Sequence, residues 1–191
     1  MKIAAHSAIM SAFFRSPHDK AKAGFTIVEL MIVITIFGVL AAVGVPAYLQ
    51  WLPDIRLKAA VRDLKSDIER SKLRAIRENA DVVMWFDTNN DTYTAYLDNG
   101  AGTGTPGDHW QNGTEPTIIN GQMPAGVDMY ETLFSSWANQ TIFDGRGLPS
   151  GGWGYVHMVN SKTNYKGILL NLAGHAQIQT STDGGIWVDE S

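Results

Sequence analysis

The apolar residues of this chain are concentrated in one long run near the N-terminus. Residues 25–45 read FTIVELMIVITIFGVLAAVGV, in which Thr26, Glu29 and Thr35 are the only polar side chains. About 20 apolar residues in a helix cross the hydrocarbon core of a bilayer. The pattern therefore predicts a membrane-spanning helix over residues 25–53, and Pro46 inside it is expected to kink the helix.

A second periodic pattern extends this helix as an amphipathic segment over residues 54–80. Apolar or small side chains recur there at spacings of four and three, which places them on one narrow stripe of a helix: Leu57, Val61, Leu64, Ile68, Ser71 and Ala75. Charged side chains occupy the other faces. We therefore expect a single helix from Phe25 to about Asn79, whose second half packs on the rest of the chain through the stripe.

Residues 81–191 change to short runs of β-type residues separated by turn residues. The runs fall at residues 82–86, 93–97, 117–119, 127–130, 141–143, 155–159, 167–171 and 177–179. Stretches rich in Gly, Asn, Asp and Thr separate them, the longest over residues 98–115. This spacing predicts an α+β fold, in which a long N-terminal helix packs on an antiparallel β domain of two small sheets.

Composition and charge exclude several classes of function. The chain has 191 residues and no Cys, which excludes disulfides, thiolate zinc sites and cysteine nucleophiles. Its net charge of −4 is divided unevenly, since residues 54–80 carry a net +3 and residues 81–191 a net −9. An acidic domain repels polyanions, so binding of nucleic acid is not expected.

The residues before the apolar run are basic, with four Lys or Arg against one Asp. Positive charge favours the cytoplasmic side, so the β domain is expected to be exported. An ordinary signal peptide is cut after its apolar segment and loses it. Here the small pair Ala23-Gly24 precedes the apolar segment. Cleavage after Gly24 would remove residues 1–24 as a leader and keep the hydrophobic helix.

Glu29 is the sharpest chemical signal in the chain. An ionisable side chain inside an apolar span costs a few kcal/mol on insertion scales, so it is expected to have a partner or a role. Cleavage after Gly24 would create an α-amine on Phe25, which is mostly cationic at neutral pH. Glu29 would neutralise that amine, in its own chain or in a neighbouring copy. The alternative is a carboxylate near the helix end that reaches the lipid headgroups.

The segment Gly24-Phe25-Thr26-Ile27-Val28-Glu29-Leu30-Met31 resembles the class III signal of type IV pilins and pseudopilins. The resemblance implies that prepilin peptidase cuts after Gly24, that Phe25 is N-methylated, and that Glu29 docks the subunit onto its neighbours. It implies a single-pass helix that lies in the inner membrane and later in the filament core, with residues 81–191 in the periplasm. The implied partners are the bilayer, other major and minor subunits, and the inner-membrane assembly platform.

Three further segments, residues 69–83, 142–149 and 167–174, are similar to the H-type minor pseudopilins of type II secretion and their FimT-like pilus relatives. This similarity implies a pilin-like subunit near the filament tip that supports protein secretion. The alternative is a minor pilin of a type IV pilus, acting in pilus assembly or DNA uptake. Two features depart from the group: the leader is long, with Met10 as another possible start, and His175 stands where relatives often have Arg.

Other motifs in the chain are weak. Residues 102–107 match GxGxxG but contain Pro106 and lack the strand and helix of a dinucleotide site. Asp87, Asn89 and Asp91 alternate as calcium ligands do, although a hairpin turn explains them. No GxSxG, SxxK or HExxH occurs, so no enzymatic activity, cofactor or metal is expected. Three isolated histidines are expected to be packed or at the surface: His109, His157 and His175.

The basic side chains of the helix and the tryptophans complete the candidate residues. Interleaved acids indicate a solvated or neighbour-facing surface, rather than a phosphate-binding one, for Arg62, Arg70, Arg74 and Arg77. Trp85 and Trp153 lie in or beside strand runs and are expected in the core. Trp110 and Trp187 lie in polar segments and are expected to be exposed contact points.

Overall fold

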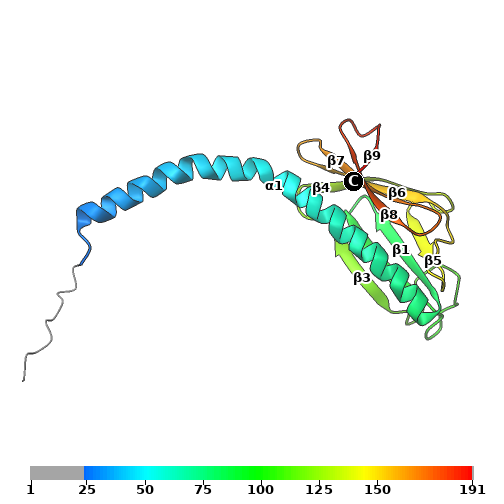
Figure 1. Ribbon diagram of the computed structural model, residues 1–191. Coiled ribbons are helices and arrows are strands. Elements are labelled where there is room, and N and C mark those ends of the chain that lie inside the picture. Colours follow the sequence, from blue (N-terminus) through cyan, green and yellow to red (C-terminus); the bar gives the residue numbers. More distant parts are fainter. Residues whose placement is uncertain (1–23, 191) are drawn as a thin grey trace, which may run out of the picture. The chain divides into compact units, whose positions relative to one another are not determined.

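The computed structural model describes residues 24–190 of the chain. It divides into two compact units, one ending at Gly44 and the other running from Val45. Helix α1, Ile27–Glu78, passes through both, and nine strands follow it in the second unit (Figure 1). The predicted leader lies outside the described residues, except for Gly24.

Helix α1 begins after Thr26 and ends before Asn79 because both residues cap it. The Thr26 hydroxyl oxygen accepts a hydrogen bond from the Glu29 backbone N–H at 3.1 Å. At the other end, Asn79 has a left-handed backbone with φ 49°, and the Ala80 N–H donates to the Ala75 carbonyl at 3.3 Å. The prediction of one continuous helix is confirmed. Because of these caps, the helix begins and ends slightly inside the predicted bounds.

The nine strands form two antiparallel sheets, which together with their loops make up the β domain. One sheet has the order β3-β2-β1-β5 and the other the order β4-β6-β7-β8-β9. The predicted α+β fold is therefore confirmed. The strands are β1 (Asp81–Asp87), β2 (Thr92–Asp98), β3 (Thr117–Gln122), β4 (Val127–Phe134), β5 (Gln140–Phe143), β6 (Gly154–Asn160), β7 (Tyr165–Leu170), β8 (Ala176–Ser181) and β9 (Val188–Asp189).

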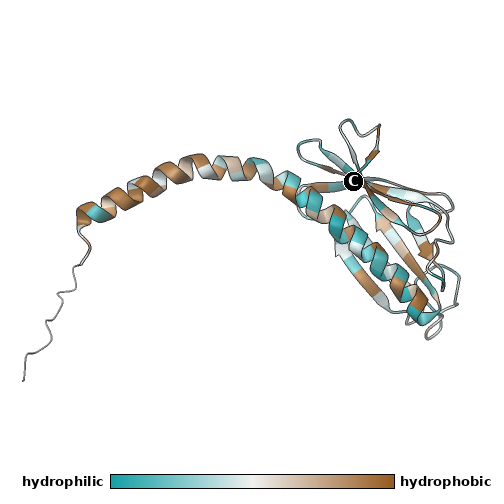
Figure 2. Ribbon diagram, viewed as in Figure 1, coloured by the Kyte–Doolittle hydropathy of each residue, from teal (hydrophilic) through white to brown (hydrophobic). Residues whose placement is uncertain are grey.

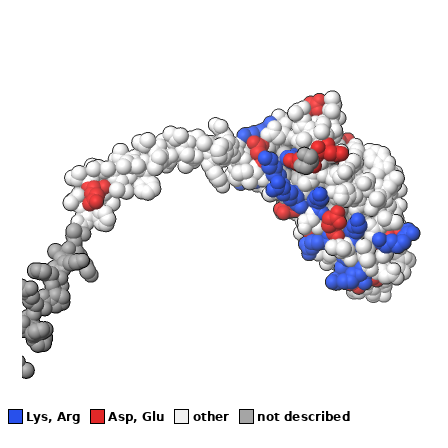
Figure 3. Space-filling view, viewed as in Figure 1, with Lys and Arg blue, Asp and Glu red and all other residues white. Residues whose placement is uncertain are grey.

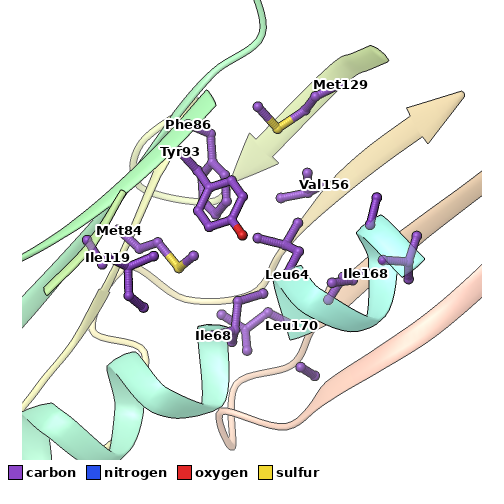
Figure 4. Close-up of a cluster of buried hydrophobic side chains, with 14 of the residues drawn as sticks. Leu64, Ile68, Met84, Phe86, Tyr93, Ile119, Met129, Val156, Ile168 and Leu170 are labelled. Atoms are coloured by element: carbon purple, nitrogen blue, oxygen red, sulfur yellow. The ribbon is translucent and has the colours of Figure 1, made fainter. Parts of the chain in front are cut away.

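The predicted stripe of α1 is buried against both sheets. All six of its residues are buried, and Ala60 joins them on the same helix face. Figure 4 shows Leu64 and Ile68 among side chains from the four-stranded sheet, such as Phe86, and from the five-stranded sheet, such as Val156. One apolar core thus holds the second half of α1 to the β domain.

Polar and aromatic contacts join the elements around this core. Phe86 of β1 stacks on Phe134 of β4 with ring centroids 5.4 Å apart. The Tyr93 hydroxyl donates to the Asp67 carboxylate of α1 at 2.8 Å. Burial, with that carboxylate beside it, raises the pKa of Tyr93. The tyrosine therefore stays neutral and keeps donating at any physiological pH.

One buried hydroxyl in the core has no hydrogen-bond partner within residues 24–190. It belongs to Thr141 of β5, which is 1% exposed. Thr141→Val keeps the shape of the side chain and removes the unsatisfied oxygen, so we expect it to raise the free energy of unfolding by about 1 kcal/mol. Urea unfolding of the purified chain measures this, with Thr132→Val on a half-buried strand position as control. An unchanged or lower stability of Thr141→Val would contradict the expectation.

Candidate processing and assembly site

Gly24 and Phe25 lie immediately before the cap of α1 and are free of packing. A Cβ added at Gly24 would meet no described atom within 4 Å beyond its chain neighbours. The Phe25 side chain is exposed. The peptide bond between them lies outside any helix or strand, as sites of proteolysis in proteins generally do. Cleavage at this bond stays a prediction that this geometry permits.

Glu29 lies in the first turn of α1, three residues after the capping residue Thr26. The T-x-x-E spacing is that of a capping box. Its backbone N–H bonds to the Thr26 hydroxyl, and the Leu30 N–H bonds to the Thr26 carbonyl at 3.1 Å. The N-terminal end of a helix favours a negative charge. The fold thus holds Glu29 in place through its backbone and leaves its carboxylate available.

The carboxylate of Glu29 differs from the other polar groups of the apolar run. Thr26 uses its hydroxyl in the cap, and the Thr35 hydroxyl donates to the Met31 carbonyl at 2.7 Å. Both threonines are therefore satisfied within the helix and tolerate an apolar environment. Among the described residues, none hydrogen-bonds or ion-pairs with the Glu29 carboxylate. Glu29 is therefore the polar side chain of this run whose charged group has no partner within residues 24–190, and its pairing with an amine stays a prediction.

The apolar half of α1 has no protein cover in the described chain. We call residues 25–51 the shaft, and every one of them is exposed. Figure 2 shows hydrophobic residues on all visible sides of this segment. The helix is long and apolar enough to cross a membrane. A helix apolar on all sides is stable only when lipid or other helices surround it.

Pro46 lies inside α1, within the shaft. Its missing N–H leaves the carbonyl of Ala42 without its usual helical partner. This lost bond is the physical reason to expect a kink at Pro46. The kink itself stays a prediction.

The turn between β6 and β7 binds α1 at the C-terminal end of the shaft and just after it. The Asp54 carboxylate accepts hydrogen bonds from the side-chain amides of Asn160 and Asn164, at 2.7 and 2.6 Å. The Lys162 ammonium donates to the Gln50 carbonyl. The amides of Asn164 and Asn160, and then the charge of Lys162, lower the pKa of Asp54. We call these contacts the clamp at Asp54. The sequence did not indicate them, and they tie α1 to the β domain from about Gln50 onward along the chain.

The turn whose acidic residues alternate as calcium ligands do is explained by its protein hydrogen bonds. One Asp87 oxygen accepts from the backbone N–H groups of Asn89 and Asn90. An Asp91 oxygen accepts from the Met129 N–H at 2.8 Å, which joins the β1–β2 turn to the other sheet. These carboxylates therefore have structural roles. The GxGxxG match lies in the loop between β2 and β3, followed by a strand instead of the helix that a dinucleotide site needs.

The three histidines are packed or exposed, as predicted. His175 is exposed, and His109 lies with its Nε2 3.5 Å from an Asp81 oxygen. His157 is buried on the outer face of the five-stranded sheet, between the rings of Tyr155 and Trp187, with ring centroids at 4.2 and 3.7 Å.

His157 is expected to make the stability of the β domain depend on pH. Burial lowers the pKa of His157, although its hydrogen bond to Glu131 acts in the opposite direction. The unfolded chain therefore takes up a proton near pH 6.5 that the folded chain resists, and stability falls as the pH drops below this value. The melting temperature measured from pH 7.5 to 5.5 should decrease. His157→Gln should flatten the decrease, and His175→Gln at an exposed position should not.

The basic residues of α1 lie among acids, as predicted for a solvated surface. Arg70 pairs with Asp67 at 3.0 Å, and Arg74 pairs with Glu78 at 3.1 Å. Arg77 lies 3.5 Å from the same Glu78 carboxylate. Figure 3 shows Lys and Arg in a row along the second half of α1, with acidic residues interspersed. Ion pairs that remain partly open to solvent contribute little to stability.

The prediction that Trp85 and Trp153 are core residues is wrong. Both are exposed, Trp85 to 37%. Trp85 lies on β1 between core residues that face α1, so strand alternation turns it to the opposite face of the sheet. Trp153 precedes β6. Trp110 is exposed as predicted, whereas Trp187 is half-buried against His157 and is not a free contact point.

Comparison with known proteins locates the recognisable segment at the N-terminus. Residues 19–45 match the family described as "Prokaryotic N-terminal methylation motif". Two proteins of Pseudomonas aeruginosa, each named "Fimbrial protein", are 38% identical over 64 residues, which cover 34% of this chain and 41% of each relative. These matches concern the N-terminal segment alone, which carries the methylation motif and is similar to that of fimbrial proteins. The chain spans less than half the length of these curated pilin relatives, and the likeness does not extend to their whole sequences.

Two solved structures align with this chain at low sequence identity. The minor pseudopilin EpsH from the type 2 secretion system of Vibrio cholerae aligns with a TM-score of 0.49 and 11% identity, covering 64% of this chain and 95% of that one. The type IV minor pilin FimU of Pseudomonas aeruginosa aligns with a TM-score of 0.48 and 9% identity, covering 69% and 92%. Likeness at this level does not separate a pseudopilin from a pilin.

Proposed function

We propose that the chain is a minor pseudopilin subunit of a type II secretion pseudopilus. In this proposal prepilin peptidase cuts after Gly24 and methylates the new N-terminal Phe25. The subunit is then assembled near the filament tip, where it supports protein secretion. It acts as a structural subunit and not as an enzyme.

The observation that carries this proposal is the exposed shaft with one unpartnered acid. Lipid tails and neighbouring apolar helices solvate such a helix about equally well, so moving it from a bilayer into a helical bundle changes its free energy little. Glu29 then supplies the register. Left unpaired in an apolar bundle it is costly, and paired with the α-amine of Phe25 in its own chain or the next it is neutralised.

The proposed location and partners follow from the same segment. The basic residues before the shaft favour the cytoplasm, so the shaft crosses the inner membrane once and the β domain lies in the periplasm. The lipid bilayer surrounds the shaft before assembly. Other major and minor subunits surround it afterwards, and an inner-membrane assembly platform brings them together.

A minor pilin of a type IV pilus is the second candidate function. The identity to fimbrial proteins over the N-terminal segment favours it. A role in pilus assembly requires only features that the chain has. A role in DNA uptake is disfavoured, because residues 81–191 carry three Lys or Arg against twelve Asp or Glu.

Intact mass and N-terminal sequencing of the protein purified from its native membrane test the processing step. We expect a chain that begins at Phe25 and carries one added methyl group. Gly24→Val should leave the leader attached because a branched side chain replaces the small residue before the cleaved bond. Gly38→Val changes another glycine with open surroundings and should be processed normally. A mature chain that begins upstream of Gly24, or that lacks the shaft, contradicts the proposal.

Deletion of the gene separates the two candidate functions. Loss of secreted proteins from the culture medium, with surface pili intact, is expected for the pseudopilin. Loss of surface pili with normal secretion would favour the pilus subunit.

A further inference from the structure

A groove of about 350 Å³ opens on the outer face of the four-stranded sheet. Strand register places Thr94, Trp85 and Gln140 in one row across β2, β1 and β5. This row faces away from α1, because the neighbouring positions of β1 belong to the core. The loop between β2 and β3 forms the other wall. The lining residues are Trp85, Thr94, Tyr96, Trp110, Gln111 and Gln140.

The groove is lined by only two kinds of side chain. Every lining residue is either aromatic or a neutral side chain with hydrogen-bonding groups. An aliphatic peptide would be matched by aliphatic side chains, which are missing from this lining. A ligand with flat C–H faces and a rim of hydroxyl groups matches both kinds of residue, since rings pack against its faces and amides donate to and accept from its hydroxyls. Carbohydrates have this structure.

Gln140 supplies a second and independent observation. It is only 7% exposed, and its side-chain amide forms no hydrogen bond with another residue in the described range 24–190. By contrast, the Gln111 amide donates to the Thr117 hydroxyl at 2.8 Å. The amide atoms of Gln140 are not among the fully buried side-chain atoms of residues 24–190 that lack a partner, so they reach the solvent in the groove. The donor and acceptor of Gln140 are therefore available to a bound molecule.

Trp110 is presented by a stiff loop. The Asp98 carboxylate is buried and accepts hydrogen bonds from the backbone N–H groups of Gly107 and His109, both at 2.7 Å. The Tyr96 hydroxyl donates to the His109 carbonyl at 2.7 Å. Trp110 nevertheless remains 68% exposed. A rigid, exposed aromatic side chain loses little conformational entropy when it binds a ligand.

The surrounding charge restricts the ligand further. From Asp81 to Gly145 the sequence has no Lys or Arg and nine Asp or Glu. Phosphates, nucleic acids and acidic sugars would meet repulsion with no compensating cation. The ligand is therefore not an anion, and the groove lining has no carboxylate that would pair with a cation.

We propose that this groove binds a neutral oligosaccharide. Trp85 and Trp110 are the stacking surfaces, and Thr94, Gln111 and Gln140 bond the hydroxyl groups. The proposal does not depend on whether the chain acts in secretion or in a pilus.

Tryptophan fluorescence and calorimetric titration of the full purified chain test the proposal. The detergent must be zwitterionic, because maltoside headgroups would compete. The probes are chitotetraose, cellotetraose and maltotetraose, with tetragalacturonate as an acidic counterpart. We expect saturable binding of at least one neutral probe, with a Kd of about 1 mM or tighter, and tetragalacturonate at least tenfold weaker. Trp110→Ala and Gln140→Leu should each weaken binding at least tenfold.

Trp153→Ala is the matched control, since it removes an exposed tryptophan beside the other sheet and should bind normally. Trp110→Ala removes an exposed side chain and should fold normally, so it decides the proposal even if Gln140→Leu does not fold. Three results would overturn the proposal: no neutral probe saturates, Trp110→Ala binds as tightly as the original chain, or tetragalacturonate binds equally well.

Discussion

Glu29→Ala is expected to leave the chain in the membrane fraction and to lower its incorporation into filaments at least tenfold. Insertion should survive because the substitution makes the shaft more apolar. Incorporation should fail because the neighbouring α-amine, proposed to come from Phe25, then enters an apolar bundle without its counter-charge. Removing one partner of a buried ion pair costs several kcal/mol, and a tenfold loss needs only about 1.4 kcal/mol. Quantitative immunoblotting of sheared filaments against membranes measures the ratio.

Two further variants isolate the charge from the change in size. Glu29→Gln keeps the volume and the hydrogen-bonding groups, so it should also fail if the carboxylate must neutralise an amine. Thr35→Ala removes a polar side chain that is already satisfied by the Met31 carbonyl, and should assemble normally. Normal incorporation of Glu29→Ala would refute the pairing role and favour a carboxylate that only reaches the headgroups.

The helix could be predicted from sequence because its signals are local. The spacing of Leu57, Leu64 and Ala75 defines one face of a helix whatever it packs against, and that face is the buried one. The signal at Gly24 and Glu29 is equally local, because it depends on a short segment of adjacent residues.

The faces of the strands were harder to predict because burial there depends on distant elements. Trp85 and Met84 are adjacent β-type residues on β1, yet Met84 is fully buried under α1 and Trp85 faces outward. Only the docking of the helix decides which of the two faces becomes the core. The outward groove and the Gln140 amide that lines it therefore had no signal in the sequence, since the groove is formed by three strands and a distant loop.

The second large effect is expected in the core, where Leu64→Ala should lower the free energy of unfolding by about 3–5 kcal/mol. Leu64 is 0% exposed and lies among residues of both sheets (Figure 4). Removing the Leu64 side chain beyond its Cβ leaves a cavity. The helix cannot close this cavity without moving relative to one of the two sheets. Urea unfolding followed by circular dichroism measures the loss.

Leu73→Ala is the matched control, because it makes the same chemical change on the same helix at a position 64% exposed. We expect a change within about 0.5 kcal/mol for this variant. The difference between the two variants reports the contribution of the buried stripe itself, since helix propensity cancels. If both variants lost the same stability, α1 would not be held by its apolar face, and the clamp at Asp54 would have to secure the helix to the β domain alone.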